Sequence, residues 1–239
     1  MDGIGSTHMI DIILIEPKTQ KNLGAAARSM KNFGFSNLVL IDPKCKIGIE
    51  ARKVAKHAQE ILKKAKTKDK KYLKRYDCLI GTTAILGRAY NLPRNPMTPK
   101  ECAQKIAQVN PKTKIGLIIG RENSGLTNEE IEQCDMLVHI PASKIYPTMN
   151  VSHALSIFLY EFFIAMNAEH TSSHIVQASS KEKDVLLKYI DDVIDVTDFQ
   201  TPEKKETQRK VWKRIVGKAL LTKKEAYAIM GFFLQLIRK

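Results

Sequence analysis

Short apolar runs alternate with helix-like segments from residue 10 to residue 168, and this alternation limits the chain to a small set of folds. The apolar runs predict buried strands over residues 10–16, 38–41, 78–81, 115–119 and 136–140. Between and after them, apolar spacing predicts helices over residues 22–33, about 50–65, 99–108, from 128 onward, and 151–168. Strands joined through helices pair in parallel, so we predict an α/β fold whose parallel sheet carries helices on both faces.

A second, smaller unit follows this predicted sheet domain, which we assign to residues 9–169. Small polar residues dominate residues 170–180 and predict a linker. Residues 181–239 then form a helical extension, with amphipathic helices expected over residues 181–196, 207–218 and 223–237. Three helices make a marginal core, so the extension is expected to lean on the sheet domain or on a partner subunit. Residues 1–8 resemble an expression-vector remnant in front of Met9.

The composition argues against a membrane segment and a metal site. The longest apolar run, residues 154–166, is interrupted by Glu161 and falls short of the roughly 20 residues that a membrane-spanning helix needs. The four cysteines form no C-x-x-C pair, which argues against a zinc or redox site and suits a reducing cytoplasm. We therefore expect a cytoplasmic protein without a metal.

The charge of the chain favours a polyanionic partner. The formal net charge is +14, and each phosphate that a basic side chain neutralises releases a condensed counterion. The charge is concentrated in residues 44–75, with thirteen basic against three acidic residues, and in residues 203–239, with eleven against three. A solvated helix face explains the run 63–74 equally well by itself, but two separate basic segments favour RNA.

Three polar segments separate strand-like runs from helices, and the first of them is residues 22–28. Asn22 stands at the start of the predicted helix, where its side chain can accept a hydrogen bond from a terminal amide. Gly24 and Arg28 are one turn apart, so the missing side chain of Gly24 is expected to leave space beside the guanidinium for a phosphate or a ribose. Without the other motifs, Arg28 is best interpreted as an ordinary surface residue.

The second polar segment, residues 120–126, precedes a T-x-x-E capping box formed by Thr127 and Glu130. It follows the run 115–119, so it would lie at the carboxyl end of a parallel strand, where α/β sheets usually bind ligands. Glu122 in this loop is expected to hold backbone amides, to orient Arg28 or a cofactor, or to do both.

The third polar segment, residues 141–149, lacks apolar periodicity, so it offers backbone amides and carbonyls that can read an adenine edge beside the next helix. His153, on the first turn of that helix, is better explained as a packed or capping residue than as a general base. No G-x-G-x-x-G pattern follows the first strand, which leaves a Rossmann-type nucleotide site without support.

In this order, the three segments resemble the signature motifs of the SPOUT RNA methyltransferases, specifically the TrmJ type of the TrmH family. The helical extension is similar to the C-terminal region of that family at Phe199 and over residues 209–215, 221–226 and 229–231. The resemblance implies a C-terminal trefoil knot in the sheet domain, a homodimer, and S-adenosyl-L-methionine as methyl donor. It also implies 2'-O-methylation of a tRNA ribose, at nucleotide 32 of the anticodon loop with cytidine favoured. Methylation of ribosomal RNA and a non-catalytic RNA-binding role are the alternatives.

The resemblance also implies roles for individual residues. Arg28 would be the catalytic arginine, supported by Asn22 and Glu122. Because a guanidinium stays protonated at neutral pH, it would stabilise a developing alkoxide and hold a phosphate rather than accept a proton. The bent cofactor would be wrapped, mainly by backbone groups, by Thr82, Thr83, Ala84, Gly120, Ile140, Pro147, Thr148 and Met149. RNA contacts are expected at Arg88, Arg94, Lys213 and Arg214.

Overall fold

A six-stranded, wholly parallel sheet forms the centre of the protein. The computed structural model describes residues 10–84, 96–167 and 176–237. The strand order is β3-β2-β1-β5-β4-β6, and in the middle of the sheet Ile13 lies opposite Val39 on one side and Ile118 on the other. The strands are β1 (Ile10–Ile15), β2 (Leu38–Ile41), β3 (Lys66–Lys68), β4 (Cys78–Thr83), β5 (Ile115–Ile119) and β6 (Met136–His139).

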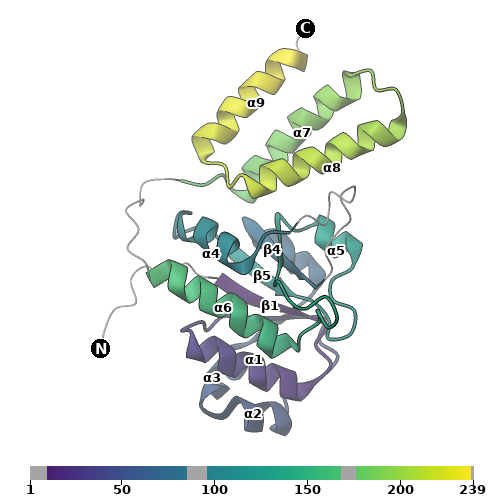
Figure 1. Cartoon of the computed structure of the whole chain (residues 1–239). Helices are drawn as coiled ribbons and strands as arrows, with labels where there is room; N and C mark the ends of the chain where they lie inside the picture. The colour runs from purple at the N-terminus through teal and green to yellow at the C-terminus, as the bar shows by residue number, and fades with distance from the viewer. Residues whose placement is uncertain (1–9, 85–95, 168–175, 238–239) are drawn as a thin grey trace.

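Helices cover both faces of the sheet, as predicted, but unequally (Figure 1). The larger core lies on the face that is covered by α1 (Gln20–Asn32), α2 (Ile49–Ala55), α3 (Gln59–Lys64), α4 (Pro99–Ala107) and α6 (Val151–Asn167). The smaller core lies under the short 3-10 helix η2 (Lys70–Arg75) and α5 (Asn128–Glu132), which contribute Leu73 and Ile131. The face with α5 is therefore thinly covered.

Two parts of the sheet domain differ from the prediction. The single helix expected over about residues 50–65 is broken into α2, the 3-10 turn η1 (Lys56–Ala58) and α3, and Lys56 has φ 52° at the break. The strand β3 was not predicted, because its three residues are all exposed and carry no apolar signal. Backbone pairing with β2 defines it, and lysines on such an edge strand discourage pairing with other chains.

The helical extension consists of α7 (Ser180–Val196), α8 (Pro202–Lys218) and α9 (Lys223–Ile237) around its own small core. Ser179 caps α7 by accepting a hydrogen bond from the Glu182 amide, so the helix begins at the last residue of the expected linker. The helix α8 begins at Pro202 rather than at residue 207, because Thr201 caps it and proline suits the first helical position.

A buried lysine joins the extension to the sheet domain. Lys183 is only 6% exposed, and its Nζ donates to the carbonyl of Asp77 at 2.5 Å and to the carboxylate of Asp135 at 3.3 Å. The same carboxylate accepts a hydrogen bond from the Leu79 amide at 2.8 Å. A Cβ atom at Gly217 of α8 would lie 2.8 Å from the Asp135 carbonyl oxygen, so only glycine permits this close approach. The extension was expected to pack on the sheet domain or on a partner subunit, and the structure shows that it packs on the sheet domain.

The described residues also bear on membrane and metal binding. No helix among them is long and apolar enough to cross a membrane. Within the same residues, no group of three or more His, Cys, Asp and Glu side chains is arranged to hold a metal ion.

Candidate functional site

A cavity of about 250 Å³ lies at the carboxyl ends of β4, β5 and β6. The loops that follow these strands form most of its wall, and the first turns of α6 complete it. All eight residues for which the sequence predicts cofactor contacts line this one cavity, namely Thr82, Thr83, Ala84, Gly120, Ile140, Pro147, Thr148 and Met149. The structure thus brings them together from three distant parts of the chain, while their contact with a cofactor stays a prediction.

The cavity combines apolar walls with a polar rim. Its apolar lining includes Ile119, Leu126, Ile140, Val151, Ala154 and Phe158. Asn123, Ser124 and Thr148 add polar groups, whereas the hydroxyl of Thr82 already donates to the carbonyl of Ile118 at 3.0 Å. Pockets for small ligands commonly have this composition, in which apolar surface supplies contact and a few polar groups fix orientation.

The loop over residues 120–126 is a closed turn. Arg121 and Gly125 exchange backbone hydrogen bonds of 3.1 and 3.0 Å, and Gly125 has φ 66°, a conformation that glycine adopts without strain. A Cβ atom at Gly120 would lie 2.3 Å from the carbonyl carbon of Gly125 and 2.6 Å from the amide nitrogen of Leu126. The loop backbone therefore packs directly against Gly120 at the edge of the cavity.

A charged cluster that the sequence analysis missed supports this loop. The Arg121 guanidinium donates two hydrogen bonds to Glu130, at 2.8 and 2.9 Å, and a third to Glu16 at 2.7 Å. Lys70 lies 2.9 Å from the Glu130 carboxylate. Burial by itself raises the pKa of Glu130, but the hydrogen bonds from Arg121, the Thr127 amide and Lys70 outweigh it and lower this pKa to about 2. The side chain of Arg121 thus anchors the loop to Glu130 of α5 and to Glu16, the residue after β1.

Replacing Arg121 with methionine is expected to destabilise the protein, because the buried Glu130 carboxylate keeps only the exposed Lys70 as an ionic partner. Removing one member of a buried ion pair costs roughly 3 to 5 kcal/mol, because the other charge stays buried. We expect the midpoint of thermal unfolding to fall by about 10 °C. The double variant Arg121→Met/Glu130→Met removes both charges and should recover most of this loss. An equal loss in both variants would show that the pairing of Arg121 with Glu130 is not what stabilises the loop.

Glu122 connects the second polar segment to the first. Its carboxylate accepts hydrogen bonds from the backbone amides of Lys18 and Thr19, at 3.2 and 3.1 Å, and from the Asn22 side chain at 3.2 Å. Of the roles expected for Glu122, the structure shows the holding of backbone amides. No hydrogen bond or ion pair joins Glu122 to Arg28 in the described part of the chain.

Asn22 and Asn150 extend this connection to the start of α6, directly after the third segment. The side-chain oxygen of Asn22 accepts a hydrogen bond from the Asn150 side chain at 3.1 Å, and Asn150 in turn accepts one from the Ser152 amide at 2.9 Å. The cap expected at Asn22 is wrong, because Thr19 occupies the N-cap position of α1 and Asn22 is the third residue of the helix. Hydrogen bonds thus join the first two polar segments to each other and to Asn150, the residue that follows the third segment.

The space expected beside Gly24 does not exist. A Cβ atom there would lie 2.3 Å from the carbonyl oxygen of Ala51 and 2.8 Å from Cβ of Val54, because α2 packs directly on this glycine. Arg28, one turn later, is exposed on α1 and is not part of the cavity lining. Among the described residues it has no ion-pair partner. Arg28 is therefore not among the residues that line the cavity of its own chain.

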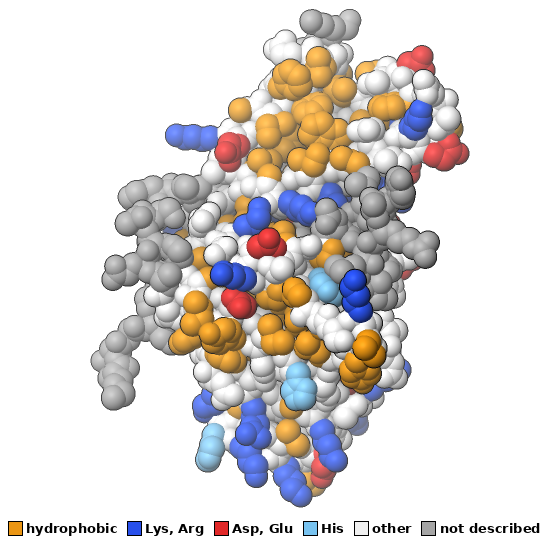
Figure 2. Space-filling model, viewed as in Figure 1, with side chains coloured by type: hydrophobic (Ala, Val, Ile, Leu, Met, Phe, Trp, Pro, Cys, Tyr) orange, Lys and Arg blue, Asp and Glu red, His pale blue; other side chains and the backbone are white. Residues whose placement is uncertain are grey.

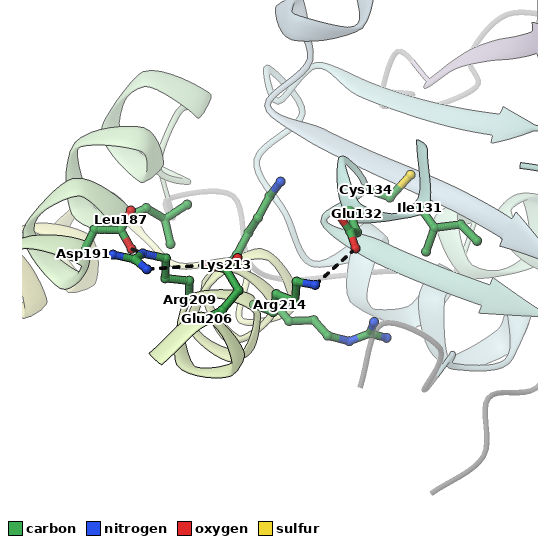
Figure 3. A pocket seen from close by; sticks show the side chains of 10 residues that line it. Ile131, Glu132, Cys134, Leu187, Asp191, Glu206, Arg209, Lys213 and Arg214 are labelled. Atoms are coloured by element: carbon green, nitrogen blue, oxygen red, sulfur yellow. Dashed lines mark hydrogen bonds and ion pairs between the residues drawn. The ribbon is translucent and has the colours of Figure 1, made fainter. Parts of the chain in front are cut away.

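The residues predicted to contact RNA fall in two places. Arg88 and Arg94 lie outside the described residues. Lys213 and Arg214 line a second cleft, of about 260 Å³, between α8 and the α5 end of the sheet domain (Figure 3). Carboxylates share this cleft: Glu132 lies 3.8 Å from Lys210, and Asp191 lies 3.7 Å from Arg209. The RNA role of Lys213 and Arg214 stays a prediction.

Comparisons with known proteins agree on one group of relatives. The family model described as the SpoU rRNA Methylase family matches residues 9–160. The tRNA (cytidine-2'-O-)-methyltransferase TrmJ of Methanocaldococcus jannaschii is 41% identical over 229 residues, which cover 94% of this chain and 98% of that protein. A probable methylase family protein from Haemophilus influenzae Rd KW20 has a solved structure that covers 97% of both chains, with a TM-score of 0.63 and 28% identity.

A further solved structure, TrmJ from Z. mobilis ZM4, covers 95% of this chain and 98% of its own. Its TM-score of 0.69 at 22% identity is evidence for the fold alone. The predicted fold class, a SPOUT-type α/β domain with a parallel sheet followed by a helical region, is thereby confirmed. The path of the chain through a trefoil knot stays a prediction.

Proposed function

The chain belongs to the SpoU rRNA Methylase family, and from this premise we propose that it transfers a methyl group from S-adenosyl-L-methionine to a ribose 2'-hydroxyl of tRNA. The observation that carries the proposal is the single cavity that collects all eight predicted cofactor residues. The relative that is named a tRNA (cytidine-2'-O-)-methyltransferase matches almost the full length of this chain. Nucleotide 32 of the anticodon loop, with cytidine preferred, is the finer part of the proposal.

The cavity suits this cofactor chemically. Ile119, Leu126 and Phe158 offer apolar surface to a purine ring, and the backbone of the three loops offers hydrogen bonds to its edge. Met149 is 40% exposed at the rim, so its flexible side chain can close over a bound ligand. When bound, S-adenosyl-L-methionine would supply its electrophilic methyl group to the 2'-oxygen, with S-adenosylhomocysteine as the leaving group and the hydroxyl proton released to solvent. The protein then has to hold the two reactants in line, and such alignment contributes as much as about 7 to 11 kcal/mol in favourable cases.

Arg28 is the residue that we assign to the ribose oxygen. Its guanidinium is a permanent donor, so it stabilises negative charge at the 2'-oxygen and holds the neighbouring phosphate. Arg28 is exposed and does not line the cavity of its own chain. We therefore propose that the arginine of each site comes from the other copy in a homodimer.

A homodimer through the α1–α6 face would supply this arginine to the site. Tyr160 and Ile164 of α6 are each 51% exposed, and Phe163 packs beside Phe33 at the end of α1. Hydrophobic side chains gather on this face of the molecule (Figure 2). The two-fold symmetry of an isologous dimer would cover these side chains. In such a dimer, the exposed side of α1, which includes Arg28, would face α6 of the other copy.

Mass spectrometry of tRNA tests the proposal directly. Purified protein is incubated with unmodified tRNA and S-adenosyl-L-methionine that carries an isotope-labelled methyl group, and the labelled nucleotide is mapped. We expect one labelled ribose, at cytidine 32. Label at another tRNA nucleotide would correct the position, and label in ribosomal RNA alone would replace the substrate. The absence of label in either RNA would refute methyl transfer and leave the non-catalytic alternative.

A further inference from the structure

The two basic segments differ in how much of their positive charge is already paired. In the helical extension, five basic residues form ion pairs with carboxylates: Lys183, Lys205, Arg209, Lys210 and Lys223. The extension from residue 181 to the end has fourteen basic and nine acidic residues. In residues 44–75, all of which are described, Lys70 alone forms an ion pair with a described carboxylate. Unpaired positive charge is therefore concentrated in residues 44–75.

These residues, which we call the basic edge, form the border of the sheet domain at β3. They comprise the loop after β2, then α2, α3, β3 and η2, and β3 is the outermost strand of the sheet. Lys53, Lys63, Lys66 and Lys71 are all exposed there. The helical extension docks at the opposite border, against the β4 and β6 side (Figure 1). Basic side chains also crowd the α2 end of the molecule in Figure 2.

The basic edge is continuous with the candidate site at two points. At the first, α2 packs on Gly24 of α1, one turn before Arg28. At the second, Lys70 at the start of η2 lies 2.9 Å from Glu130 and 3.9 Å from Glu16, the two carboxylates that hold Arg121. An RNA backbone that lies along this edge would therefore pass close both to α1, which carries Arg28, and to the loop beside the cavity.

The ring of Tyr72 holds two cationic side chains of the basic edge, Lys68 and Arg75, in place. The Arg75 guanidinium lies 4.7 Å from the ring centre of Tyr72 and donates a hydrogen bond to its hydroxyl, and the Lys68 ammonium lies 5.4 Å from the same ring. Cation–π contacts hold these groups without neutralising their charge. Both cations therefore stay available to an anion while their side chains are held in place.

We propose that the basic edge is the principal surface on which tRNA docks, and that the helical extension supplies little of the phosphate binding. This inference rests on the proposed function, because it takes tRNA as the polyanion. It assigns the backbone contacts of the RNA to residues 44–75, with exposed lysines such as Lys53 and Lys66 contacting phosphates, while the extension is a docked structural unit.

Two matched variants test the proposal, each of which removes four exposed lysines without ion-pair partners among the described residues. The edge variant carries Lys53→Gln, Lys63→Gln, Lys66→Gln and Lys71→Gln. The control variant carries Lys181→Gln, Lys188→Gln, Lys204→Gln and Lys224→Gln in the extension. Affinity for unmodified tRNA is measured over a series of salt concentrations, and S-adenosyl-L-methionine binding and thermal unfolding report that each variant is folded.

The edge variant is expected to bind tRNA at least about tenfold more weakly, with a salt dependence that is reduced by about 2 to 4 in log–log slope. The control variant should change the slope by less than about 1. An unchanged slope in the edge variant, or a larger loss in the control variant, overturns the inference while methyl transfer to tRNA by the wild type still supports the proposed function. Wild-type protein that neither binds nor methylates tRNA overturns both.

Discussion

Replacing Arg28 with lysine is expected to lower the turnover number of tRNA methylation by about 100- to 1000-fold, the cost of removing one well-placed donor from a developing oxyanion. Lysine keeps the charge but lacks the planar fork that binds an oxygen and a phosphate together. Because Arg28 is assigned to the ribose oxygen and the neighbouring phosphate rather than to the cofactor, S-adenosyl-L-methionine should bind Arg28→Lys with unchanged affinity. Single-turnover kinetics and calorimetric titration with the cofactor measure the two quantities separately.

Lys21 offers a matched control on the same helix. It is exposed on α1, and Lys21→Gln removes a positive charge without touching the cavity lining. The turnover number of this variant at saturating tRNA should stay within about twofold of the wild type, as is usual for surface positions away from the reacting groups. Wild-type turnover in Arg28→Lys would remove Arg28 from the mechanism, and an equal loss in Lys21→Gln would show that the effect is not specific to Arg28 on the exposed side of α1.

Mixed dimers determine which copy supplies Arg28. A protomer with Arg28→Lys keeps an intact cavity, and a protomer with a damaged cavity keeps its arginine. If the arginine comes from the other copy, each mixed dimer has one complete site, and random exchange should restore about a quarter of wild-type activity. If each chain uses its own arginine, the mixture should be as inactive as the two variants apart.

The position of the loop over residues 120–126 could be predicted from chain order, because loops after parallel strands meet at one edge of the sheet, where ligands usually bind. The assignment of Thr82 and Ile140 to the same site came from the resemblance to the SPOUT methyltransferases. Reasoning from chain order also predicted both faces of the sheet and the helical extension. It needed only apolar periodicity and the positions of turns.

The parts that were missed depend on contacts between distant segments. Arg121 and Glu16 are 105 residues apart, and nothing in the pattern of either segment indicates that they pair. The prediction of open space beside Gly24 was wrong for the same reason, since the position of α2 on α1 decides whether a missing side chain leaves a space or a contact. Local periodicity describes which face of a helix is buried, but it does not describe what covers that face.

Replacing Gly120 with alanine is expected to weaken cofactor binding more than any other single methyl group added to the loop. The new Cβ would lie 2.3 Å from the carbonyl carbon of Gly125 and 2.6 Å from the Leu126 amide nitrogen, so the backbone has to move. Overpacking of this kind typically costs 1 to 3 kcal/mol, roughly a 5- to 150-fold loss if it acts on the bound state. Calorimetric titration with S-adenosyl-L-methionine measures the loss.

Gly231→Ala separates this steric effect from the general effect of adding a methyl group. No atom lies within 4 Å of a Cβ placed at Gly231 in α9, and alanine favours a helix over glycine by about 1 kcal/mol. This variant should unfold at a higher temperature and bind the cofactor as the wild type does. Wild-type cofactor affinity in Gly120→Ala would mean that the loop opens without disturbing the ligand. The adenosyl group would then not bind against the part of the cavity wall that residues 120–126 form.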